Sequence, residues 1–105
     1  KDFLPDNGNG GVIVSKDGTD ICAGYLYFTN SKAVWVEFVV SNINYKDKDR
    51  KQAIMFLVDT LTEYAKLNGA KYAYVSLKSQ PLINKFIECG FQQGSVGCTE
   101  LIKTL

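Results

Sequence analysis

The sequence predicts an α/β domain built on a mixed sheet. Short apolar stretches of strand character lie between residues 12 and 40, apolar residues recur at helical spacing from Ile54 onward, and an alternating stretch follows at residues 71–77. A strand, a helix and a strand in succession imply a parallel pair joined by a right-handed crossover. The chain has 105 residues, which is enough for one hydrophobic core and one domain, residues 1–105.

The first part of the chain predicts three strands. Residues 1–11 are polar and rich in glycine, so we expect a flexible lead. Residues 12–14 begin a strand, a polar turn at residues 16–19 follows, and residues 21–28 return as the second strand of a hairpin. Residues 33–40 are apolar at nearly every position except Glu37, which is typical of a central strand covered on both faces near a parallel crossover.

The rest of the chain alternates helices and strands. Asp49 and Gln52 have the spacing of a capping box for the long helix, and Gly69 is placed to end it. After the strand at residues 71–77, Pro81 suits the first turn of a second helix and Gly90 suits its end. A turn at residues 94–97 leads to a last strand at residues 98–105. The predicted order is β-β-β-α-β-α-β, with a central parallel pair.

The composition excludes several classes of partner. With 46% hydrophobic residues, 22% charged residues and a net charge of +1, the chain is an ordinary globular one. We expect no nucleic-acid binding, because that normally needs a whole basic face, and no membrane span, because no apolar run is long enough. Cys22, Cys89 and Cys98 lack CxxC spacing and the chain has no His, so we expect no metal site and reduced thiols in a cytoplasmic protein.

The start of the long helix carries an unusual charge. Lys46, Lys48, Arg50 and Lys51 face only two aspartates there, although cations near a helix N-terminus cost roughly 0.3–1 kcal/mol each when exposed. A bound phosphate group would reverse that cost, and this predicts an anion site. The alternative is a solvated loop whose charges pair loosely with one another. Two features oppose anion binding: Asp49 would occupy helix amides as a cap, and the loop contains no glycine.

Residues 11–105 resemble the GNAT acetyltransferases, which transfer an acetyl group from acetyl-coenzyme A to an amine. The resemblance is strongest over residues 62–91, where a helix, a strand and a second helix end in Gly90-Phe91. It implies the GNAT-like mixed sheet and acetyl-coenzyme A as co-substrate. The family's pyrophosphate loop, Q/R-x-x-G-x-G/A, falls within residues 48–53, where both glycines are missing.

The resemblance also implies which residues meet the coenzyme. Strand backbone that holds the pantetheine arm corresponds to Phe38, Val39 and Val40. The basic position of the loop corresponds to Lys48 or Arg50, and the amides facing the pyrophosphate to Arg50, Lys51, Gln52 and Ala53.

The second helix carries two further departures from the family. Ser79 stands where an Asn commonly begins this helix, and Phe86 stands where many relatives carry a proton-donating Tyr. Phenylalanine cannot donate a proton, so an acid would have to be water or another residue. The alternative interpretation of Phe86 is a core aromatic.

Glu37 is the catalytic residue that the resemblance implies, as the base that takes the proton of the amine. A carboxylate on an apolar strand is costly unless it is paired or used, and the alternative is an edge-facing or salt-bridged glutamate. Tyr25, Tyr27, Tyr72 and Tyr74 are interpreted as sheet-surface packing.

The predicted function is therefore N-acetyl transfer to an amine. The acceptor is a small molecule or a peptide whose identity stays open, and a homodimer is left open as well. Relatives normally have a strand and one or two helices ahead of the first hairpin. We therefore expect either that such a segment precedes Lys1 or that the acceptor side is open. One alternative is an inactive GNAT-like domain that binds coenzyme A or a protein partner. Another is a basic cluster that docks an acidic protein.

Overall fold

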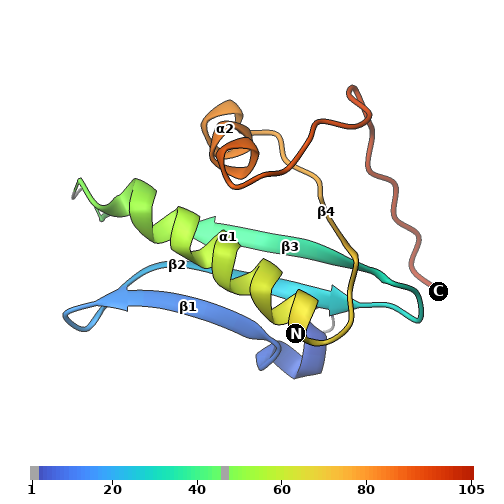
Figure 1. Ribbon diagram of the computed structural model, residues 1–105, viewed down its shortest axis with the longest axis horizontal. Helices are drawn as coiled ribbons and strands as arrows, with labels where there is room; N and C mark the ends of the chain where they lie inside the picture. The colour runs from blue at the N-terminus through green and yellow to red at the C-terminus, as the bar shows by residue number, and fades with distance from the viewer. Residues whose placement is uncertain (1–2, 46–47) are drawn as a thin grey trace.

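The computed structural model describes residues 3–45 and 48–105, apart from the side chain of Asn7. Figure 1 shows one sheet with helix α1 lying along one of its faces and α2 beyond α1. The sheet has four strands in the order β1-β2-β3-β4, antiparallel except for the last pair, which is parallel. The elements in chain order are η1 (Pro5–Gly8), β1 (Gly11–Lys16), β2 (Thr19–Phe28), β3 (Ala33–Ser41), α1 (Arg50–Leu67), β4 (Tyr72–Val75) and α2 (Gln80–Glu88).

The expected last strand and the expected central place of the parallel pair were both wrong. The last strand is not formed, because residues 92–105 pair with no other strand of the described chain. Consequently β4 is an edge strand, and the parallel pair lies at one side of the sheet instead of its centre. The lead is not wholly irregular, since Pro5–Gly8 forms a short 3-10 helix and the Tyr27 hydroxyl donates a hydrogen bond to the carbonyl of Phe3.

The predicted hairpin is confirmed, and two residues explain its turn. Lys16 pairs with Thr19, so Asp17 and Gly18 alone make the loop. Both have positive φ, 52° and 80°, as a type I′ turn requires. This turn matches the right-handed twist of the strands it joins, and Asp-Gly is among the pairs that adopt it most readily.

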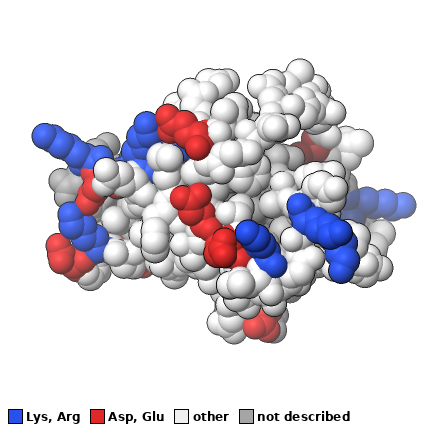
Figure 2. Space-filling view, in the orientation of Figure 1, with Lys and Arg blue, Asp and Glu red and all other residues white. Residues whose placement is uncertain are grey.

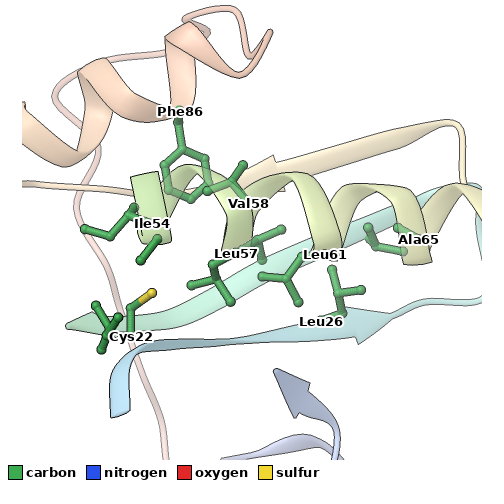
Figure 3. Packing of buried hydrophobic residues seen from close by; sticks show 12 residues of the cluster. Cys22, Leu26, Ile54, Leu57, Val58, Leu61, Ala65 and Phe86 are labelled. Atoms are coloured by element: carbon green, nitrogen blue, oxygen red, sulfur yellow. The ribbon is translucent and has the colours of Figure 1, made fainter. Parts of the chain in front are cut away.

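The core lies between α1 and the sheet. Figure 3 shows Leu57 and Leu61 of α1 above Cys22 and Leu26 of β2, with Phe86 of α2 entering from the other side of α1. Leu57 is fully buried. The helical spacing of apolar residues predicted this contact. The expectation that β3 is covered on both faces was wrong, since its other face carries exposed Trp35, Phe38 and Val40.

Both helices end where the glycines predicted. Gly90 has φ of 100°, its amide donates to Ile87, and the amide of Phe91 donates to the Phe86 carbonyl at 3.1 Å. These two bonds make a Schellman motif, and the Phe86 and Phe91 rings pack across it at 5.1 Å. Gly69 ends α1 with the same pair of bonds. No helix within residues 3–45 and 48–105 is both long and apolar enough to span a bilayer.

Candidate functional site

A bulge interrupts β3 at Phe38. Tyr25 pairs with Glu37 and Ala23 pairs with Val40, so two residues of β3 stand opposite the single residue Gly24. Phe38 is the extra residue, and its φ of 52° lies in a region that bulky side chains seldom adopt. The bulge reverses the alternation of the strand beyond it. Val39 therefore packs on the core, and Phe38 stays exposed.

Beyond the bulge, one edge of β3 has no partner strand among the described residues. The parallel pairing with β4 covers only four positions and ends at Val36 and Val75. Backbone groups from Glu37 to Ser41 on that edge are consequently available to a ligand. The chain of β4 continues without regular structure through residues 76–79 and then enters α2. Bulge and open edge together present backbone donors and acceptors beside the start of α1.

Asp49 occupies the N-cap position of α1 without capping it. Its side chain forms no hydrogen bond with the helix amides. Instead Lys16 donates to its Oδ2 and the Tyr45 hydroxyl donates to its Oδ1, both at 2.6 Å. These hydrogen bonds, with Lys16 the stronger cause, lower the pKa of Asp49. The predicted capping box is therefore wrong. The prediction for the Ala53 amide is also wrong, because this amide donates to the Asp49 carbonyl at 2.9 Å as the first bond of the helix.

The cations near this helix end have different surroundings. Arg50 Nη2 donates to Ser41 Oγ at 2.6 Å, so its guanidinium lies at the end of β3. Burial raises the pKa of Cys22, and the nearby Arg50 charge partly opposes this. Lys51 pairs with Glu88 of α2 at 3.3 Å, and Lys48 is exposed. Lys46 lies outside the described residues.

Charges elsewhere on the visible face are mixed. In Figure 2, positive side chains are scattered among negative and neutral ones and form no continuous basic face. Arg50 and Lys51 therefore act locally, through their contacts with Ser41 and Glu88.

Glu37 lies on the sheet face opposite α1 and is half-buried. It forms no ion pair with any residue of the described chain, so the salt-bridged alternative is not observed there. Burial, and then the charge of Glu100 in the C-terminal segment, raise the pKa of Glu37. The raised pKa of this carboxylate is closer to the pKa of an effective base at neutral pH.

The two residues predicted from α2 lie in different surroundings. Ser79 is exposed at the N-cap of α2 and forms no side-chain cap bond. Phe86 is 2% exposed, and Figure 3 shows its ring against Val58 and Ile54 of α1. The interpretation of Phe86 as a core aromatic is confirmed. The site proposed below therefore does not use its side chain.

Sequence reasoning missed the bulge that organises this site. Phe38 was predicted as strand backbone, without its positive φ or the shift of pairing. The sequence did carry one indication, because Gly24 interrupts a strand and an isolated glycine there often marks a bulge or a close approach. A methyl group on Gly24 would lie 3.0 Å from Leu61 Cδ1 and 3.4 Å from Val39 Cγ2, so a close approach is what the structure has.

Comparison with solved structures identifies the architecture. Glucosamine-6-phosphate N-acetyltransferase from Arabidopsis thaliana superposes with a TM-score of 0.64 at 18% identity, over 92% of this chain and 70% of that one. The fold is that of the GNAT acetyltransferases. An aminoglycoside acetyltransferase from an uncultured soil metagenomic sample gives a TM-score of 0.62 at 13% identity, over 89% of this chain and 65% of that one. A protein described as a probable acetyltransferase gives 0.63 at 14% identity, over 91% and 69%.

These likenesses concern the GNAT fold alone. No protein-family model matches the sequence, and no curated protein matches it. This chain spans 65% to 70% of the lengths of the three similar structures.

Proposed function

We propose that this chain is an N-acetyltransferase domain that transfers the acetyl group of acetyl-coenzyme A to an amine. The observation that carries the proposal is the opening of the sheet beside β3, where pairing with β4 stops at Val36 and the bulge at Phe38 begins. The fold is shared with acetyltransferases, and this opening supplies the unpaired backbone that an extended amide-containing arm needs.

The coenzyme lies along that edge in the proposal. Backbone groups of Phe38, Val39 and Val40 bind the pantetheine arm, as a strand would. The pyrophosphate meets the amides at the start of α1, from Arg50 to Gln52, which the Asp49 side chain leaves uncapped. Arg50 can keep its bond to Ser41 and still offer other N–H groups, because a guanidinium has five donors.

Glu37 is the base in this proposal. Its carboxylate takes one proton from the acceptor ammonium, and the amine nitrogen then attacks the thioester carbonyl carbon. The new C–N bond forms as the C–S bond breaks, and the second proton of the nitrogen passes to the departing thiolate. Orientation of the two reactants and polarisation of the carbonyl by backbone amides contribute most of the rate.

Calorimetric titration with acetyl-coenzyme A and coenzyme A tests the binding step. We expect saturable binding of both, weakened about tenfold at low salt by Arg50→Glu and less at high salt, because screening reduces the charge effect. Lys71→Glu makes the same charge change at an exposed position before β4 and should have little effect. Absence of binding at roughly millimolar ligand, about −4 kcal/mol or weaker, would remove the coenzyme from the proposal.

A second candidate is a GNAT-like domain that binds coenzyme A without catalysis. The observation favouring it is Phe86, which replaces a proton donor and is buried in the core. Thiol release with a panel of polyamines, aminoglycosides and peptide N-termini separates the two candidates. Coenzyme binding without release from any amine would select the inactive domain.

A further inference from the structure

The sheet face opposite α1 is rich in exposed rings. Trp35 of β3 alternates with the buried Val34 and Val36, so it points away from the core, and it is 39% exposed. Tyr74 of β4 is 52% exposed and meets Trp35 edge to face at 5.1 Å. A second pair, Tyr27 and Phe38, has ring centroids 6.2 Å apart. On this face, therefore, each of the two ring pairs joins a residue of β3 to a residue of a neighbouring strand.

Glu37 lies between Trp35 and Phe38 in sequence, and its side chain is on the same face of the sheet. It stands directly opposite Tyr25 in the register of β2 and β3, and its charge reaches Tyr27, where burial first and then Glu37 raise the phenol pKa. Glu100 approaches from the C-terminal segment closely enough to act on Glu37.

The described outward positions of β2, β3 and β4 carry no positive charge. The strand positions that alternate with the core residues of β2, β3 and β4 include no lysine or arginine. Neither Glu37 nor Glu100 pairs with a cation among the residues that the structure describes. Carboxylates beside ring faces attract a cation, and both kinds of group repel a phosphate. The ligand that complements this face is thus a cation that also carries an apolar surface.

We infer that the acceptor is a cationic amine bearing an aromatic or other apolar group, held with its ammonium at Glu37 and its apolar part on the rings around Trp35. This inference rests on the proposed acetyl transfer and names its substrate class. It excludes amines that also carry a phosphate, because Glu37 and Glu100 would repel the phosphate and the outward positions of β2, β3 and β4 offer no cation to offset this repulsion.

Binding can be measured without turnover, because Trp35 is the single tryptophan of the chain. Titration with phenethylamine should change its fluorescence saturably, whereas glucosamine 6-phosphate should not. Glu100→Lys should weaken the phenethylamine response at least about threefold, since it places a positive charge near Glu37. Phe56→Leu removes a ring of α1 that is more exposed than Trp35, 62% against 39%, and should leave the response unchanged. A stronger response to glucosamine 6-phosphate would overturn the inference.

Turnover gives the second test. We expect kcat/KM for phenethylamine to exceed that for glucosamine 6-phosphate at least about tenfold, with Trp35→Leu raising KM for phenethylamine while the Kd of acetyl-coenzyme A stays the same. Equal or reversed preference would overturn the inference and leave acetyl transfer standing. Phenethylamine binding without acetylation of any amine would instead overturn the proposed function and leave this face as a cation-binding surface.

Discussion

Asp49 accepts a hydrogen bond from Lys16 at 2.6 Å instead of capping the helix that begins beside it. The two residues are 33 positions apart, so the contact ties the β1–β2 hairpin to the start of α1. This contact holds the Asp49 carboxylate away from the helix amides that it could otherwise cap. The negative charge remains close, yet the Asp49 side chain forms no hydrogen bond with the first amides of α1.

Asp49→Asn should lower the stability of the fold above the ordinary aspartate pKa. The folded-state pKa of Asp49 is lowered, so its stabilising contribution is present above the unfolded-state pKa of about 3.9 and is lost as the pH falls through the folded-state value. Urea unfolding should show a lower midpoint for the variant at pH 7 and equal midpoints near pH 2. A difference that persisted at pH 2 would contradict the ionic origin of the effect.

Phe38→Gly should be more stable than Phe38→Ala. Both remove the ring, but only glycine adopts a φ of 52° without steric cost, and the gain is about 1 kcal/mol. In an ordinary strand the order is reversed, because glycine there costs roughly 0.5–1 kcal/mol relative to alanine. The comparison is made by urea unfolding of both variants. Alanine as the more stable of the two would place Phe38 in regular strand geometry.

Glu37→Gln should lower the acetyl-transfer activity and raise the stability of the fold at pH 7. The folded-state pKa of Glu37 is raised, so ionisation above the unfolded-state pKa favours the unfolded chain, and removing the charge should raise the unfolding midpoint at pH 7 but not at pH 3. Acetyl transfer should fall, and the acidic limb of its pH profile, which lies above the ordinary glutamate pKa, should disappear. Full activity in the variant would show that another group accepts the proton.

Phe86→Tyr should not create a better catalyst. The ring lies in the core against α1, so the added hydroxyl would be buried without a partner, at a cost of about 1–3 kcal/mol. Phe86→Ala should cost roughly 3–5 kcal/mol, as large-to-small changes at buried aromatics do. Thermal unfolding and thiol release measure the two effects. Faster acetyl transfer by Phe86→Tyr would mean that this side chain reaches the site.

Much of the fold followed from local chemistry. Asp17-Gly18 specified a turn with two positive φ values, and Gly69 and Gly90 specified the ends of both helices. The apolar spacing in α1 predicted which side of the helix meets the sheet. Each of these features depends on residues close together in the chain, so a single segment contains the information.

Other features depended on residues brought together only by folding. The capping box failed because Lys16, remote in sequence, competes for Asp49. The predicted last strand is not formed, because strand character within one segment does not decide whether that segment pairs with a neighbouring strand.

At the candidate site, some features followed from the sequence and others only from the tertiary structure. The sequence alone determined the strand carrying Glu37, the charged start of α1 and the glycine opposite the future bulge. Only the tertiary structure decided that Phe38 is the extra residue, because that choice depends on Gly24 of β2 and on Val39 packing against the core. It also decided that one edge of β3 stays open, since β4 separates from β3 after Val75. Pairing register is a property of two chain segments, and neither segment specifies it alone.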